Sequence, residues 1–224
     1  MSLPNQPATV IGVDGARGHW AMALVRATSV EFSVALDFDE VMVAAEQHSA
    51  SVVAVDMPIG LPSAGSRECD IAARQQIKGC GSRVFPAPIR GVLKAMSYDE
   101  ALAISRAATG RGLSIQAWNL VPAIREVDPW GMDARVVEAH PEVSFALMAG
   151  RPILASKKTA EGRAARLALV IDWLGPLTVP RGDDHLDALA CAWTARRVAA
   201  HQMLTLGAEP PAVDDAGRPM RILA

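Results

Sequence analysis

Short apolar runs alternate with longer stretches of mixed polarity along this chain. Three runs predict strands at 8–15, 20–27 and 29–38; the first is apolar and β-branched, and a turn at 16–19 joins it to the second. Residues 39–48 have apolar positions at helical spacing, and residues 52–56 form a nearly continuous apolar run that ends in an aspartate. Such a run is typical of a parallel strand that is covered on both faces. The pattern predicts the order strand, strand, strand, helix, strand.

The pattern changes between residues 62 and 130, where helical spacing dominates. We expect helices at 63–77, 98–110 and 113–130, with a proline-broken loop after the first. Ser66 is a candidate N-cap for the first helix, and Pro122 predicts a break or bend in the third. We therefore interpret residues 62–130 as a helical insertion and not as an independent domain.

Regular α/β signals return after the insertion. They predict a strand at 134–140, helices at 141–150, 162–175 and 183–203, and a terminal hairpin within 213–223. Pro141 suits the first turn of a helix. The 224 residues are half hydrophobic, which is enough for one sizeable core. We expect a single domain, residues 1–224, that contains the insertion.

Charge is unevenly distributed. The formal net charge is −2, which argues against a general nucleic-acid coat protein. Residues 62–111 nevertheless hold eight Lys and Arg against four acids, and residues 151–166 hold five against one. Two local basic stretches therefore lie in a mildly acidic chain.

The cysteine count and the N-terminus bear on the cellular compartment. Three cysteines without a CxxC pair argue against a disulfide framework or a zinc knuckle, and they fit a reducing environment. The N-terminus does not have the pattern of a signal peptide, and the sequence contains no apolar run long enough for a membrane span. We expect a soluble, cytoplasmic protein.

Carboxylates stand where strands end and where the last helix begins. Asp14, Asp56 and Glu138 end predicted strands, and Asp184 and Asp187 open the final helix. Strand ends converge on one edge of an α/β sheet, so these acids are candidate catalytic residues and metal ligands. Oxygen ligands suit Mg²⁺ or Mn²⁺, and two such ions about 4 Å apart activate water for phosphodiester cleavage.

Each acid also has a structural interpretation. Asp14 fits a turn, and the acids of the last helix favour its dipole. Glu138 is a candidate ion-pair partner of Arg135 or Arg163. Asp56 is harder to explain in this way, because an apolar strand seldom ends in a buried carboxylate without a partner.

Several basic residues are candidates for substrate binding. They are Arg67, Arg74, Arg83, Lys157, Lys158 and His140. His140 lies two residues after Glu138, so both point the same way from an extended strand, and His140 is a candidate metal ligand or proton shuttle. The alternatives are an ion-paired helix face with Asp70, a solvated lysine pair and a buried histidine whose hydrogen bonds are satisfied.

Seven motifs together carry a family resemblance. They are VIGVDGARGHW, VVAVDMPIGLP, RECDIAAR, SRVFPAPIRGVL, EAHPEVSF, SKKTAEGRAARL and DDHLDALACAWTA, and they span roughly residues 10–195. In this order they resemble domain-of-unknown-function family 429, whose members are predicted ribonuclease H-like nucleases. The segment DDHLDALACA also resembles the DxxDA ending of Holliday-junction resolvases, with matches at Asp184, Asp187 and Ala188.

The resemblance implies an α/β ribonuclease H-like fold. In that fold three antiparallel strands are followed by parallel strands, and helices flank the mixed sheet. It also implies that Asp14 is the first-strand acid, Asp56 the fourth-strand acid, and Asp184 or Asp187 the last-helix acid. Glu138 has no firm counterpart in this nuclease triad.

Three functions compete at this point. The first is a metal-dependent phosphodiester hydrolase, a nuclease on DNA or RNA whose basic stretches grip the phosphate backbone. The second binds a nucleotide or a phosphorylated small molecule, as actin-like ATPases do, with 12–19 and 55–60 as phosphate loops. The third is a non-catalytic interaction protein. The insertion could also serve as the interface of a homodimer.

Overall fold

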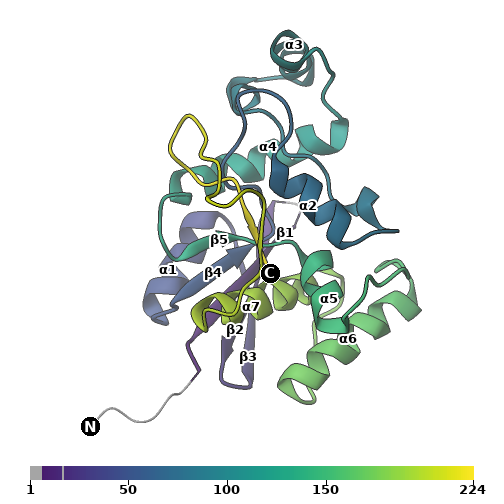
Figure 1. Cartoon of the computed structure of the whole chain (residues 1–224). Helices are drawn as coiled ribbons and strands as arrows, with labels where there is room; N and C mark the ends of the chain where they lie inside the picture. The colour runs from purple at the N-terminus through teal and green to yellow at the C-terminus, as the bar shows by residue number, and fades with distance from the viewer. Residues whose placement is uncertain (1–6, 17) are drawn as a thin grey trace.

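A mixed five-stranded sheet forms the centre of the computed structural model, which describes residues 7–16 and 18–224 (Figure 1). Its strands are β1 (Val10–Ala16), β2 (His19–Arg26), β3 (Ser29–Ala35), β4 (Val52–Val55) and β5 (Val136–Glu138). Their order is β3-β2-β1-β4-β5, antiparallel among the first three and parallel from β1 through β4 to β5. The predicted mixed sheet, in which three antiparallel strands are followed by parallel strands, is confirmed. Residues 1–6 and 17 lie outside the described residues. Part of the N-terminal segment and part of the turn predicted at 16–19 are therefore not described.

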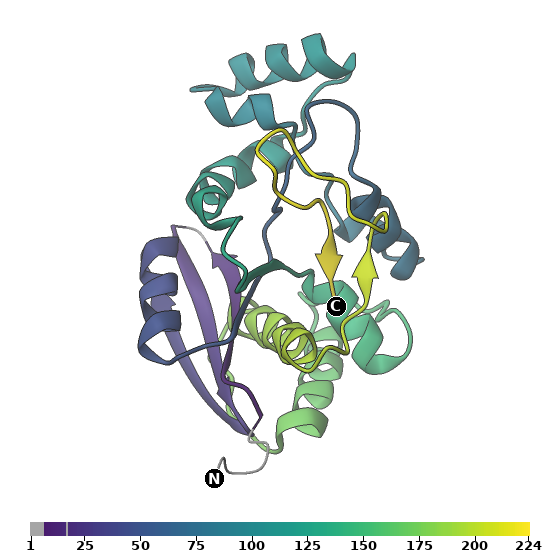
Figure 2. The same ribbon diagram turned by 60° about the vertical axis from the view of Figure 1, so that its left-hand side comes forward.

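Helices cover both faces of this sheet. On one face lie α1 (Phe38–Gln47) and α4 (Ile115–Val127), and on the other lie α6 (Ala160–Leu174) and α7 (Asp184–Ala199) (Figures 1 and 2). The alternation within β1 separates the two cores, because Ile11 and Val13 pack with α1 whereas Val10 packs with α7.

The closest packing in the fold joins α7 to β1. A Cβ atom on Gly12 would lie 1.9 Å from the carbonyl oxygen of Ala188 and 2.1 Å from the amide nitrogen of Ala192. Only glycine on the strand and small residues on the helix permit this approach. The alanine-rich sequence of α7 therefore brings the first turn of the helix against the end of β1.

The region 62–130 contains α2 (Glu68–Gln76), α3 (Tyr98–Thr109), α4, and the 3₁₀ turns η1 (Gly81–Arg83), η2 (Arg90–Lys94) and η3 (Asp128–Trp130). It has a small core of its own around Ile89, Val92 and Val121. The first helix begins five residues later than predicted, and Arg67, not Ser66, holds the N-cap position. Helix α4 continues through Pro122 to Val127. That this region is an insertion within one domain stays a prediction.

The C-terminal half follows the predicted order, and its elements are shorter than predicted except α6, which begins two residues earlier. Helix α5 (Pro141–Ala149) starts at the proline as expected, and α7 ends at Ala199, before the predicted 203. The tail forms a wider hairpin than predicted, because β6 (Thr205–Leu206) pairs with β7 (Ile222–Leu223) outside the bridge between Val213 and Pro219. A parallel bridge from Ala139 to Leu223 continues the main sheet edge. Among the described residues, no helix is both long and apolar enough to cross a bilayer.

Candidate active site

A pocket of about 500 Å³ opens at the carboxyl ends of β1, β4 and β5. All five predicted acids line it: Asp14, Asp56, Glu138, Asp184 and Asp187. The sheet register explains part of this convergence, since Val13 lies beside Val55 in parallel strands and the Asp56 amide donates to the Val13 carbonyl at 3.0 Å. Asp14 and Asp56 therefore each come directly after the last residue pair, Val13 and Val55, that joins β1 to β4.

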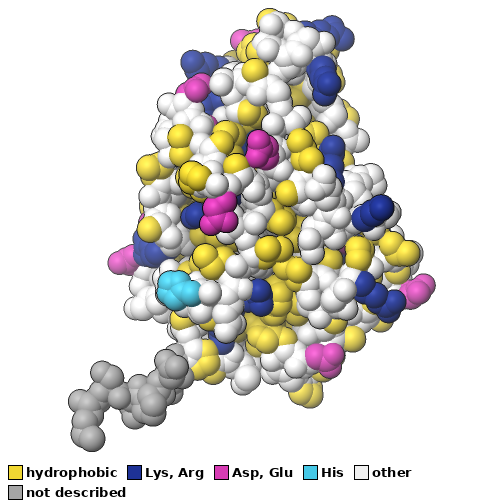
Figure 3. Space-filling view, in the orientation of Figure 1, with side chains coloured by type: hydrophobic (Ala, Val, Ile, Leu, Met, Phe, Trp, Pro, Cys, Tyr) yellow, Lys and Arg dark blue, Asp and Glu magenta, His cyan; other side chains and the backbone are white. Residues whose placement is uncertain are grey.

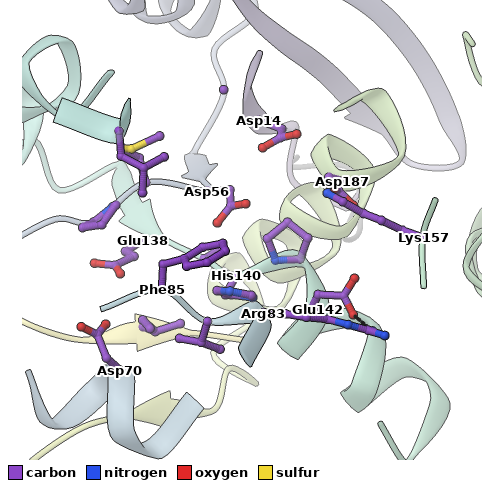
Figure 4. Close-up of a pocket in the computed structure, with 18 of the residues that line it drawn as sticks. Asp14, Asp56, Asp70, Arg83, Phe85, Glu138, His140, Glu142, Lys157 and Asp187 are labelled. Atoms are coloured by element: carbon purple, nitrogen blue, oxygen red, sulfur yellow. Dashed lines mark hydrogen bonds and ion pairs between the residues drawn. The ribbon is translucent and has the colours of Figure 1, made fainter. Parts of the chain in front are cut away.

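Helix α7 supplies the other two acids from its first turn. Asp187 is 2 % exposed and Asp184 is partly buried. The contact between Gly12 and Ala188 fixes the distance between helix and strand, and Asp187 is the residue just before that contact. Figure 4 shows Asp14, Asp56 and Asp187 around the same part of the pocket, with Glu138 farther away near Asp70.

Burial and mutual repulsion weaken the acidity of this cluster. Burial, with the charges of Asp56 and Asp187, raises the pKa of Asp14 well above its ordinary value. Burial also raises the pKa of Asp56, against the opposing effect of His140 and Lys157. The pKa of Asp187 rises to about 7 by burial, although Lys157 opposes the rise. Such a group of close carboxylates is stabilised by any nearby cation.

Lys157 supplies one such cation from the loop between α5 and α6. Its Nζ donates to Oδ2 of Asp187. Burial alone would lower the pKa of this ammonium group, but the charges of Asp187, Asp14 and Asp56 outweigh burial and raise it. The neighbouring Lys158 is exposed and also lines the pocket.

Glu138 has a different environment from the aspartates. Its two carboxylate oxygens accept from Arg67 Nη1 and Nη2, both at 2.7 Å, and Oε2 also accepts from the Ile59 amide at 2.7 Å. Arg67 lies 2.5 Å from Asp70 and donates to the Ile59 and Gly60 carbonyls at 3.2 Å. Both ends of this ion pair are buried, with side chains 5 % and 1 % exposed. The protein itself thus occupies the groups that we expected to contact a metal and a substrate.

The ion-pair partners predicted for Glu138 were wrong. Arg135 pairs with Asp133 and Glu46, and Arg163 pairs with Asp183. Arg135 and Arg163 lie 3 and 25 residues from Glu138 in the sequence, whereas the true partner is 71 residues away, in the helical region 62–130. Sequence separation gave no hint of this pairing.

The remaining basic candidates divide into structural and pocket-facing groups. Arg74 donates twice to the Val84 carbonyl at 3.0 Å. Arg83 lines the pocket but binds Glu142 at 2.7 Å and two backbone carbonyls. His140 also lines the pocket, and its buried Nδ1 has no hydrogen-bond partner among the described residues. On the face of the molecule drawn in Figure 3, Lys and Arg side chains are scattered and do not gather into one patch.

Sequence reasoning missed two features of the pocket. Phe85, which lies in the proline-rich loop, is 49 % exposed and lines the pocket next to the acids. The fully buried Arg166 binds both oxygens of Glu142 at 2.8 Å below the pocket wall. An exposed aromatic side chain marks a candidate contact surface, but its exposure becomes visible only in three dimensions.

The donor set suits a hard divalent ion, since the aspartates offer only oxygen. In the described part of the chain, however, no group of three or more His, Cys, Asp or Glu residues is arranged to hold a metal ion. The acids share one pocket without a closed coordination shell, and Lys157 lies against one of them. The oxygen donors of the aspartates fit Mg²⁺ or Mn²⁺, but in the described residues no three of these side chains are close enough to share one ion.

Comparisons with known proteins identify the family of the chain and two similar solved structures. Residues 12–212 match the sequence profile of a family described as "Protein of unknown function (DUF429)". No curated protein matches the chain. Among solved structures, Thermus thermophilus RuvC is similar at 14 % identity, covering 87 % of this chain and 97 % of that one with a TM-score of 0.39. The same protein in complex with a Holliday junction substrate is similar at 15 % identity, with the same coverage and a TM-score of 0.41.

Proposed function

The chain belongs to the DUF429 family, and we propose for it the metal-dependent hydrolysis of phosphodiester bonds in nucleic acid. One observation carries the proposal: Asp14, Asp56, Asp184 and Asp187 line a single pocket at the strand ends of a ribonuclease H-like sheet. Their repulsion and burial, seen in the raised pKa values of three of them, make the pocket a receptor for a divalent cation.

These four aspartates would hold Mg²⁺ or Mn²⁺, which when bound activates water and offsets charge on the phosphate. His140 lies near enough to Asp56 to lower the pKa of that carboxyl group, and its position suits proton transfer at the pocket. Lys158, exposed at the rim, attracts the phosphate backbone.

Glu138 and Arg67 have a structural role under this proposal. Their pair binds the Ile59 amide and the Ile59 and Gly60 carbonyls, and so fixes the backbone that follows Asp56. We assign both as positioning residues and not as metal or substrate ligands.

The shape and volume of the pocket limit the kind of substrate that it can bind. Its walls come from the sheet ends, from Arg83 and Phe85 on the insertion, and from the loop that carries Lys157 and Lys158. A volume of about 500 Å³ is that of a small-ligand site. A single nucleotide fits such a space, so we expect cleavage beside an unpaired or flipped nucleotide.

The same volume supports a second candidate, a hydrolase or binding protein for a free nucleotide. A phosphotransferase of the actin-like type is less well supported, because the described residues hold one such five-stranded sheet and not the two that form that clamp. The two candidates differ in their ligand: the first binds and cleaves polynucleotides, and the second binds mononucleotides.

The test is cleavage of fluorescent single-stranded, duplex and branched DNA and RNA with Mg²⁺ or Mn²⁺. We compare the wild type with Asp14→Asn and Asp56→Asn, after circular dichroism has verified that the variants fold. Metal-dependent cleavage by the wild type alone supports a nuclease. If all three proteins leave every polynucleotide intact, the nuclease proposal fails, and thermal shifts with mononucleotides test the second candidate.

A further inference from the structure

Lys157 lies inside the acid cluster as a permanent cation. Its side chain is 38 % exposed, and its Nζ donates to Asp187, whose side chain is 2 % exposed. The charges of Asp14 and Asp56 also act on this ammonium group. Three of the four aspartates that would hold metal ions therefore already interact with a positive charge from the protein.

The loop that carries Lys157 is fixed by backbone packing. A Cβ atom on Gly162 would lie 2.0 Å from the Ser156 carbonyl oxygen, so the loop rests directly on the start of α6. Thr159 Oγ1 donates to the same carbonyl at 2.8 Å and accepts from the Gly162 amide at 3.1 Å. The buried Arg166 holds the carbonyl just before Ser156 at 3.1 Å. These contacts fix the backbone on both sides of Lys157.

We propose that Lys157 occupies one of the two cation positions of this cluster, so that the site binds a single divalent ion per chain. The inference rests on the proposed function, because it concerns the ion count of the same site. It replaces our expectation of a two-ion centre.

The charge balance supports one ion. Arg67 pairs with both Glu138 and Asp70, and two arginines pair with Glu142. Within the described part of the chain, the carboxylates of the pocket wall without an arginine partner are the four aspartates Asp14, Asp56, Asp184 and Asp187. Lys157 and one divalent ion together supply three positive charges against these four negative ones. A second divalent ion would reverse the balance and lie beside an ammonium group that repels it.

The experiment counts ions and does not depend on catalysis. Bound Mn²⁺ is titrated by electron paramagnetic resonance of the free ion on the wild type, Lys157→Met and Lys157→Gln. Lys157→Arg keeps the charge, and Lys158→Met removes the adjacent charge without touching Asp187. We expect one ion for the wild type, Lys157→Arg and Lys158→Met, and two for each neutral Lys157 variant that circular dichroism shows to be folded.

Three results overturn the inference: two ions on the wild type, none on the wild type, or one ion on a folded neutral Lys157 variant. Should neither neutral variant fold, the wild-type count still decides between one ion and two. Failure of the proposed function gives a different pattern. If the ion counts are as expected but no polynucleotide is cleaved, the nuclease proposal fails and the assignment of Lys157 stands.

Discussion

Replacement of Glu138 by glutamine separates a positioning role from a metal-binding role. The change keeps the size of the side chain but removes the charge that faces Arg67 across two contacts of 2.7 Å. Breaking a buried ion pair costs about 3–5 kcal/mol, because the surviving charge remains buried. Asp70 still lies 2.5 Å from Arg67, so we expect a loss near the lower end, about 3 kcal/mol.

A loss of about 3 kcal/mol lowers the melting temperature of a chain of this length by roughly 6–12 °C. The matched control is Glu46→Gln, which breaks an equally short 2.7 Å contact to Arg135 from a side chain that is 77 % exposed. An exposed pair contributes about 1 kcal/mol or less. Differential scanning calorimetry measures both variants, and Mn²⁺ titration measures their ion affinity.

We expect Glu138→Gln to melt well below Glu46→Gln while it keeps the wild-type Mn²⁺ affinity. Equal melting temperatures for the two variants would show that the buried pair contributes no more than a surface pair. A large loss of Mn²⁺ affinity in folded Glu138→Gln would return Glu138 to the metal ligands. Either result refutes the assignment of Glu138 as a positioning residue.

Three further predictions follow from other parts of the structure. Gly12→Ala puts a Cβ atom 2.1 Å from the Ala192 nitrogen, so it destabilises the fold by about 3 kcal/mol or more in denaturant unfolding and weakens Mn²⁺ binding. Burial acts to raise the pKa of Glu142, but hydrogen bonds from Arg166 and Arg83 outweigh it and hold this pKa below the ordinary 4.5. The stability that Glu142 contributes is therefore present above pH 4.5. It is lost as the pH falls through the lower pKa of the folded state. The free energy of unfolding of Glu142→Gln should fall less steeply below pH 4.5 than that of the wild type. If both proteins show the same slope against pH, this prediction is wrong. Phe85→Ala should raise KM for a single-stranded substrate about tenfold, because a base can no longer stack on the ring. The melting temperature should hardly change, since Phe85 is 49 % exposed. An unchanged KM would show that Phe85 does not contact the substrate.

The sheet and the gathering of the acids could be predicted because both depend on local patterns. The run at 52–56 is apolar at every position but the last, which indicates a covered parallel strand with a carboxylate at its end. Alternating alanines in 188–192 indicate close packing, and the structure has that packing at Gly12. The α/β class then places strand ends, and hence Asp14 and Asp56, at one edge.

The partners of the charged residues could not be predicted in the same way. Arg67 pairs with Glu138 across 71 residues, and Lys157 pairs with Asp187 across 30. These contacts depend on the path of the insertion and of one loop, which leave no periodic trace in the sequence. The helix start at 68 shows the same limit, because Arg67 is held by a distant carboxylate where local capping rules favour Ser66.

The contact between Gly12 and Ala188 also sets the order of events during folding. The two residues are about 175 positions apart, so the closure of almost the whole chain must precede their contact. The hairpins of β1, β2 and β3 need only neighbouring residues and can form early. We therefore expect the hairpins to present Asp14 before α7 brings Asp187 beside it, so that the acid cluster assembles late. Under the proposed function, Mn²⁺ uptake should then lag behind hairpin formation, and stopped-flow mixing measures that delay.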